Sequence, residues 1–208
     1  MSAAVAERVA AGPLLGDEDR ARAEHYAVLS RLFAAPPDAG FLTGLPALAG
    51  VWGGSEGALA LAWGALGDAA RGVDAEAVED EYTRLFLTIG RPEVMLYGSF
   101  YLAGFLMEKP LVALRDDLAE LGLGRRPQVT ESEDHVAALC DVMRHLIVTG
   151  PDAAGLARQK AFFSAHLAPW TNALADALAN APEARFYPRT AALVRAFFDI
   201  ERLAFDML

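Results

Sequence analysis

A short stretch, TESEDHVAALCDVM at residues 130–143, places acids and a histidine at the start of an otherwise apolar helical segment. The clustered side chains are those of Glu131, Glu133, Asp134 and His135. Carboxylates beside an imidazole could hold a metal ion, form an acid–base pair or line an edge that binds a cationic peptide. A plain helix cap is the fourth interpretation, because Thr130 and Glu133 have capping-box spacing and the helix dipole favours acids in a first turn.

His135 is the member of this cluster that a cap explains least well. A cationic imidazole at a helix N-terminus is disfavoured by the helix dipole. We therefore expect either a neutral, hydrogen-bonded ring or a compensating carboxylate nearby. His135 precedes Leu139 by four residues and Val142 by seven, which puts it at the edge of the apolar face. A lone histidine in that position is more often a half-buried structural residue than a ligand.

The metal interpretation would make the protein a helical metal-dependent enzyme that uses Glu131, Asp134, His135 and His145. Glu131 and His135 are four residues apart and could share one helix face, as could Asp141 and His145. The Glu-x-x-His pairs of carboxylate-bridged helical bundles do not occur in the sequence. The only cysteine, Cys140, lies in an apolar helix, where a thiol is usually inert. We therefore predict no catalytic residue, no metal and no cofactor.

Composition limits the choice of partners. The chain has 208 residues, of which 54% are hydrophobic and 22% charged, so we expect a well-filled core rather than disorder. Its net charge of −10 repels phosphate backbones and attracts basic peptides, which disfavours nucleic-acid binding. Neither a secretory signal nor an uninterrupted apolar stretch of membrane-spanning length is apparent. We expect a cytoplasmic protein without stable membrane insertion.

A second dense stretch, residues 79–110, concentrates tyrosines and phenylalanines. Tyr97, Tyr101 and Phe105 are four residues apart and would form an aromatic ridge on a helix, while Phe86 and Phe105 are predicted to fill the core. The Tyr97-Gly98-Ser99 sequence is an unusual way to fill a core, since glycine permits close backbone approach and tyrosine suits binding edges. An apolar groove flanked by acids would suit a peptide that is apolar along one face and basic at one end.

The elements that must position these residues are all predicted to be helices, because the apolar residues recur at spacings of three and four. We expect a single compact helical domain of about eight to ten helices over residues 17–208. Residues 1–16 are expected to form a flexible N-terminus, and residues 122–129 a hinge. Asp17, Asp38 and Asp74 are predicted caps, and Pro110 should kink or divide a long helix. The helices are predicted to cover approximately residues 17–35, 38–48, 55–72, 74–89, 97–121, 130–148, 151–166, 169–180 and 186–205.

Taken together, several motifs resemble the TorD/DmsD/NarJ-like family of redox-enzyme maturation chaperones. The family's Tyr-x-x-Leu-Phe element corresponds to YTRLF at residues 82–86, and its second element to Tyr97-Gly98-Ser99. The acidic signature ending in Asp-His appears as ESEDH at residues 131–135, and His-x-x-Pro-Trp as HLAPW at residues 166–170. Leu96 and Ser132 stand where the family usually has proline, so we expect these two loops to be less rigid than in the family.

The resemblance implies an all-helical, TorD-like chaperone without catalysis. Such a protein would bind the twin-arginine signal peptide or the apo form of a molybdenum or tungsten oxidoreductase, assist cofactor insertion and prevent premature export. The stretch at residues 97–123 looks most like chaperones associated with formate dehydrogenases. A hinge over residues 122–129 would allow two protomers to exchange lobes, so we expect a monomer or a domain-swapped dimer. The residues that the resemblance places in the client-binding site are Tyr97, Gly98, Ser99, Tyr101, Glu131, Asp134 and His135.

Overall fold

The computed structural model describes residues 15–53, 56–87, 92–125 and 129–208, and these segments form ten helices. The helices are α1 (Asp17–Ala34), α2 (Ala39–Trp52), α3 (Ala58–Arg71), α4 (Ala75–Phe86), α5 (Gly98–Ala103), α6 (Lys109–Glu120), α7 (Val136–Thr149), α8 (Ala153–His166), α9 (Thr171–Ala179) and α10 (Tyr187–Asp206). Within these segments the only β feature is an isolated bridge between Tyr97 and His135. The all-helical prediction is confirmed.

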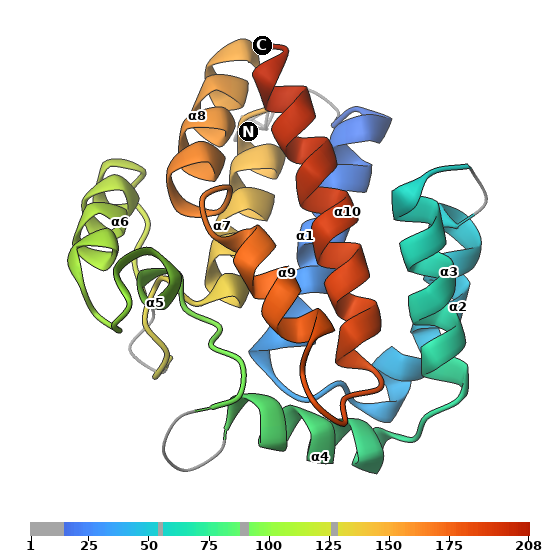
Figure 1. Ribbon diagram of the computed structural model, residues 1–208. Coiled ribbons are helices and arrows are strands. Elements are labelled where there is room, and N and C mark those ends of the chain that lie inside the picture. Colours follow the sequence, from blue (N-terminus) through green and yellow to red (C-terminus); the bar gives the residue numbers. More distant parts are fainter. Residues whose placement is uncertain (1–14, 54–55, 88–91, 126–128) are drawn as a thin grey trace, which may run out of the picture.

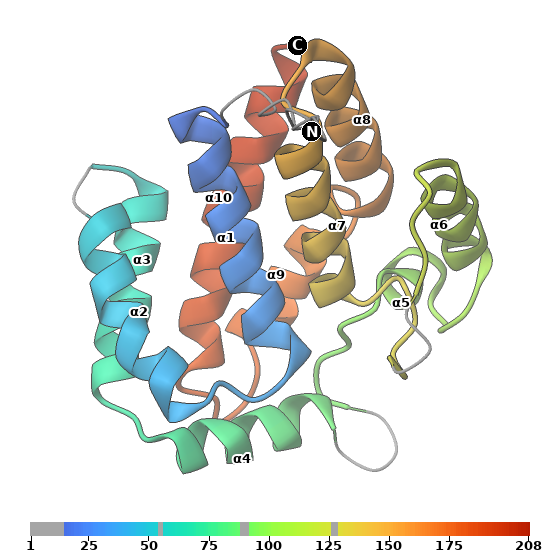
Figure 2. The same cartoon turned by 180° about the vertical axis from the view of Figure 1, so that it is seen from behind.

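The helices form a central bundle with two flanking groups (Figure 1). In the bundle α1 packs on α7, α7 on α8, and α10 on both α9 and α1. The α2–α3 pair lies on one side against α10, and α4 crosses the end of the bundle. The α5–α6 pair lies on the opposite side, and the reverse view shows the same separation (Figure 2). The sequence stretches of interest therefore meet at one edge of the molecule.

Local capping explains many of the helix starts. Asp38 and Asp74 accept hydrogen bonds from the backbone N–H groups of Phe41 (2.8 Å) and Ala77 (2.7 Å), as predicted. Asp17 does not cap α1, because Gly16 occupies the N-cap position and Asp17 pairs instead with Arg20.

The helix predicted over residues 97–121 is divided into α5 and α6, as Pro110 indicates, but the break lies before the proline. Gly104 has a left-handed φ of 82° and ends α5 after Ala103, and α6 begins only at Lys109. Pro110 lies in the first turn of α6, where a missing N–H costs no helical hydrogen bond. The predicted aromatic ridge therefore does not form, and Phe105 is 71% exposed instead of buried. Phe86, by contrast, is buried in the core as predicted.

Several predictions fall partly or wholly outside the described residues. Residues 1–14 of the expected flexible N-terminus lie outside the described residues, as do residues 126–128 of the expected hinge. Ser55, the predicted start of the third helix, and Ile89, the predicted end of the fourth, also lie outside the described residues. The hinge and the N-terminus stay predictions.

Buried polar contacts fix the helices of the central bundle relative to one another. The guanidinium of Arg22 on α1 forms a bidentate contact with Glu201 on α10, at 2.7 and 2.9 Å. The hydroxyl of Tyr26 donates to the same carboxylate at 2.9 Å. A buried ion pair satisfied in this way favours one arrangement of α1 and α10, because breaking it would leave a charge buried without a partner.

In the part of the chain that the structure describes, no helix is long and apolar enough to cross a bilayer.

Candidate functional site

Two segments that are far apart in the sequence form the backbone of the site. The N–H of Gly98 donates to the carbonyl of Asp134 at 3.0 Å, and the N–H of Val136 donates to the carbonyl of Leu96 at 2.8 Å. Tyr97 and His135 face each other in the bridge between these bonds. The start of α5 and the start of α7 are thus held together, and the residues singled out in the two stretches are in direct contact rather than across a groove.

Asp134 holds the N-terminus of α5. One carboxylate oxygen accepts from the backbone N–H of Ser99 at 2.8 Å, and the other accepts from the hydroxyl of Ser132. The residue is only 3% exposed. A buried carboxylate with two donors is well satisfied, and its charge also suits the positive end of the helix dipole. Asp134 therefore positions α5, and it presents little surface to solvent.

His135 is the N-cap of α7, and the predicted helix start at Thr130 is wrong. The Nδ1 atom accepts from the backbone N–H of Ala137 at 3.2 Å, so this nitrogen carries no proton. Burial lowers the pKa of His135 to about 4, although Glu131 and Asp134 favour the charged form. The ring meets Tyr97 edge to face, with centroids 5.0 Å apart. Of the two states predicted for this histidine, the structure has the neutral, hydrogen-bonded one.

The remaining acids of the cluster point to different partners. The hydroxyl of Thr130 donates to Glu131 at 2.8 Å, and this bond is the main cause that lowers the pKa of the exposed Glu131 carboxyl. Glu133 accepts two hydrogen bonds from Arg115 on α6, at 2.9 and 3.1 Å. The predicted capping box of Thr130 and Glu133 therefore does not exist, because Thr130 bonds its sequence neighbour Glu131 and Arg115 holds Glu133. Glu131 is the one acid of the cluster that is fully at the surface.

The second wall of the site comes from the HLAPW motif. The ring of Trp170 stacks on Tyr101, with centroids 5.4 Å apart and an angle of 18° between planes. A Cβ atom on Gly98 would lie 3.0 Å from Nε1 and 3.2 Å from Cε2 of Trp170, so glycine allows α5 to approach the indole. The indole N–H donates to the carbonyl of His166 at 2.6 Å, and the hydroxyl of Tyr101 donates to the carbonyl of Met95 at 2.9 Å.

His166 pairs with Asp117, a residue that no sequence motif indicates. Its Nε2 atom lies 2.6 Å from a carboxylate oxygen of Asp117 on α6. Asp117 precedes His166 by 49 residues and belongs to none of the motifs, so no local pattern could have pointed to the pair. The contact joins α6 to α8 beside the N-terminus of α5.

A cavity of about 170 Å³ lies between these elements. Its polar lining is formed by Ser99, Asp117, Asp134 and His166, and its apolar lining includes Leu102, Pro110, Leu114 and Leu139. Ser99 is fully buried, and its hydroxyl has no hydrogen-bond partner among the described residues. Ligand pockets for whole cofactors usually measure about 300–1,000 Å³. The cavity is therefore of the size of a single side chain.

The arrangement gives no support to the metal-dependent alternative. In the described segments no group of three or more His, Cys, Asp or Glu residues could hold a metal ion. His145 is exposed and lies ten residues from His135, which is about 15 Å along the axis of α7. Cys140 is fully buried, and burial raises the pKa of its thiol well above the ordinary value.

One hydrolase-like spacing occurs in the sequence, outside the segments that build this site. GGSEG at residues 53–57 matches Gly-x-Ser-x-Gly, but it joins two helices, whereas the nucleophile elbow of hydrolases joins a strand to a helix. The serine itself, Ser55, lies outside the described residues.

Known proteins share this chain's sequence and fold. The family model described as the nitrate reductase delta subunit matches residues 55–176. The chaperone protein TorD of Vibrio cholerae El Tor Inaba is 28% identical over 136 residues, which covers 62% of each chain. TorD of Photobacterium profundum is 25% identical over 130 residues, covering 58% of this chain and 60% of its own. The matched region thus spans less than two thirds of the length of these curated relatives.

A solved structure extends the likeness to almost the whole fold. It is the crystal structure of a candidate redox enzyme maturation protein from Archaeoglobus fulgidus, with a TM-score of 0.59 and 21% identity. The alignment covers 93% of this chain and 99% of that one, and at this identity it shows the shared fold. The family model covers more than half of the chain and includes the motifs that build the site. The chain belongs to the nitrate reductase delta subunit family, the TorD/DmsD/NarJ-like family that its motifs resemble.

Proposed function

We propose that the protein is a cytoplasmic, non-catalytic chaperone for a molybdenum or tungsten oxidoreductase. It would bind the twin-arginine signal peptide or another part of the apoenzyme, assist cofactor insertion and prevent premature export. The observation that carries the proposal is the convergence of Tyr97–Ser99, residues 131–135 and residues 166–170 at one edge of the fold. The names of the TorD relatives support the same class of function.

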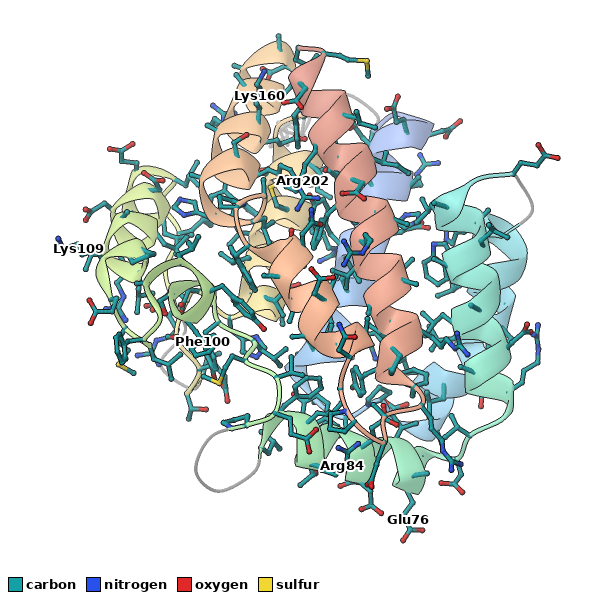
Figure 3. All side chains as sticks on the ribbon, viewed as in Figure 1. Glu76, Arg84, Phe100, Lys109, Lys160 and Arg202 are labelled. Carbon is teal, nitrogen blue, oxygen red and sulfur yellow. The ribbon has the colours of Figure 1, made fainter. Side chains whose placement is uncertain are left out.

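The surface beside the bridge suits a peptide with basic and apolar parts. Glu131 is exposed and ionised at neutral pH, since its pKa is lowered. The pKa of Tyr97 is raised by burial first and then by the nearby charge of Glu131. An exposed apolar segment covers the end of α5 and the residues just after it, and comprises Leu102, Phe105, Leu106 and Met107. Exposed apolar clusters of this kind usually mark interaction sites. Lys109 at the start of α6 points outward, away from the central bundle (Figure 3).

Within this proposal we assign the predicted site residues two roles according to their burial. Tyr97, Tyr101 and Glu131 retain solvent-accessible surface and would contact the client. Gly98, Ser99, Asp134 and His135 are buried, so they offer almost no outer surface to the client and would hold the exposed residues in position. An exposed carboxylate–arginine pair contributes only about 0–1 kcal/mol. The apolar segment would therefore have to supply much of the affinity.

Calorimetry with synthetic peptides tests the proposal. The full chain is titrated with a twin-arginine signal peptide from the molybdoenzyme encoded nearest to this gene, and with the same peptide carrying two glutamines in place of the arginines. We expect binding of the first and weaker binding of the second, and Glu131→Gln should reduce the difference. Absence of heat with every such peptide, together with full molybdoenzyme activity in a deletion strain, would reject the proposal.

Two finer parts of the proposal have their own measurements. A formate dehydrogenase client predicts that the deletion strain loses formate-dependent dye reduction and keeps nitrate reduction; the reverse pattern would assign a different client. Light scattering after size exclusion distinguishes a monomer from a dimer. A dimer exchanging lobes around residues 122–129 should persist on dilution, because exchange of whole elements replaces intramolecular contacts with equivalent intermolecular ones.

A further inference from the structure

We propose that the cavity between α5, α6, α7 and α8 is a subsite for one cationic side chain, an arginine or a lysine, of the bound client. This inference rests on the proposed chaperone function. The cavity is lined by the N-terminus of α5, by α6, by the start of α7 and by the end of α8. At about 170 Å³ it can hold one long side chain, whereas a nucleotide or a pterin cofactor needs more space.

The charges of the lining select a cation. Asp117 and Asp134 both line the cavity, and its lining includes no lysine or arginine. Asp117 uses one oxygen for His166, and its other oxygen makes no hydrogen bond among the described residues. Each oxygen of Asp134 accepts one hydrogen bond, although a carboxylate oxygen can accept two. Unused acceptors therefore remain on both carboxylates, and an anion would be repelled.

Ser99 is an independent sign that a ligand group belongs here. Its side chain is fully buried and lines the cavity, and its hydroxyl has no partner in the described parts of the chain. Most buried hydroxyl groups are hydrogen-bonded. An ammonium or guanidinium group entering the cavity could donate to the Ser99 oxygen and to the free acceptors of the two carboxylates.

The apolar lining matches the stem of the same side chain. Leu102, Pro110 and Leu114 line the cavity beside the polar groups, and lysine and arginine commonly bury their methylene groups on such surfaces. Leu102 also belongs to the exposed apolar segment that ends at Met107. A client with a basic residue in the cavity would thus place its neighbouring residues on that segment, which fits a peptide that is basic at one end and apolar beyond it.

A small-cation titration tests the cavity without a client. The full chain, labelled with nitrogen-15, is titrated with n-butylguanidinium chloride and, as the neutral matched probe, n-butylurea, at constant ionic strength. We expect saturable shifts of the backbone amide resonances of Ser99 and Asp134 with the cation and none with the urea. Equal binding of the two probes, or no shift with either, would overturn the proposal.

Peptide calorimetry with matched variants provides the second arm. Asp117→Asn keeps an oxygen that can accept from His166 but removes the charge, whereas Asp116→Asn removes the neighbouring exposed charge on α6 that does not line the cavity. We expect about a tenfold loss of affinity for the first, as for a charged hydrogen bond, and no more than about a twofold loss for the second. Ala113→Leu, which adds bulk to the lining, should also weaken binding.

The two arms separate this inference from the proposed function. If the peptide binds equally well to wild type, Asp117→Asn and Ala113→Leu, the subsite is wrong and the chaperone proposal stands. If no client peptide binds to wild type while n-butylguanidinium still shifts Ser99, the cavity binds cations and the chaperone proposal fails. Circular dichroism melting of each variant confirms that any loss of binding occurs in folded protein.

Discussion

Replacement of Asp134 tests whether this residue holds α5 in place. The carboxylate accepts from the backbone N–H of Ser99 and from the hydroxyl of Ser132 while almost fully buried. Asp134→Ala removes both acceptors and leaves a buried N–H unpaired. Hydrogen bonds to a charged group contribute about 1.5–3 kcal/mol each, so the two bonds together should cost about 3 kcal/mol or more.

Asp134→Asn is the matched variant, because it changes the charge and leaves the shape. The amide oxygen can accept from the N–H of Ser99, and the amide nitrogen can donate to the hydroxyl oxygen of Ser132. Both contacts persist without the charge, so we expect a loss of about 1 kcal/mol. Glu131→Ala, which removes the exposed acid three residues earlier, should change stability by less than about 0.5 kcal/mol.

Urea denaturation followed by circular dichroism measures these differences at pH 7. We expect midpoints in the order wild type and Glu131→Ala highest, Asp134→Asn intermediate and Asp134→Ala lowest, with similar slopes. Equal midpoints for wild type and Asp134→Ala would refute the positioning role. A loss of peptide binding in Asp134→Ala at full stability would also refute the positioning role, since the carboxylate would then act only on the cationic group of the client.

Three further predictions concern neighbouring parts of the site. The pKa of His135 is lowered from 6.5 to about 4, so the neutral ring stabilises the fold above pH 6.5, and up to about 3 kcal/mol of unfolding free energy is lost as the pH falls to 4. The urea midpoint should therefore fall less with decreasing pH in His135→Asn, which keeps an N-cap, and the same pH dependence in variant and wild type would contradict this. Gly98→Ala places a methyl group against the indole of Trp170 and should lower the free energy of unfolding by about 1–3 kcal/mol, with a shift in tryptophan emission. Gly44→Ala lies in α2 with open space around the added methyl group and should be neutral or stabilising, and equal effects of the two substitutions would argue against the close approach at Gly98. Ser99→Ala removes a hydroxyl without a partner among the described residues and should leave the melting temperature unchanged or raised; clear destabilisation would mean that this hydroxyl is already satisfied.

Helix identity and many of the helix starts could be predicted because both depend on local sequence. Apolar spacing of three and four follows from the helical repeat, and Asp38 and Asp74 cap groups only three residues ahead. The same local reasoning failed at Thr130 and Glu133. Their spacing fits a capping box, but Glu133 is held by Arg115, 18 residues earlier in the chain. Capping patterns cannot reveal a tertiary competitor of this kind.

The candidate site shows the same boundary between local and long-range information. The motifs indicate Tyr97–Ser99 and residues 131–135 as candidate site residues, but only the fold shows that Tyr97 and His135 form a bridge. The pairing of Asp117 with His166 depends on how α6 lies against α8, and no spacing in the sequence encodes it. Phe105 is predicted in the core only for a helix that continues past Gly104, whereas the left-handed backbone at Gly104 ends the helix and Phe105 is exposed.

Site-specific photocrosslinking tests the central claim most directly. A benzoylphenylalanine is introduced at Tyr97, beside the bridge, at Leu102, in the exposed apolar segment, or at Val51 on α2, which lies on the opposite side of the molecule and is 68% exposed. Each protein is irradiated with the labelled twin-arginine peptide of the client. The proposed site predicts crosslinks from Tyr97 and Leu102 and none from Val51. Crosslinks from Val51 with none from the other two positions, by a peptide that binds all three proteins, would contradict it.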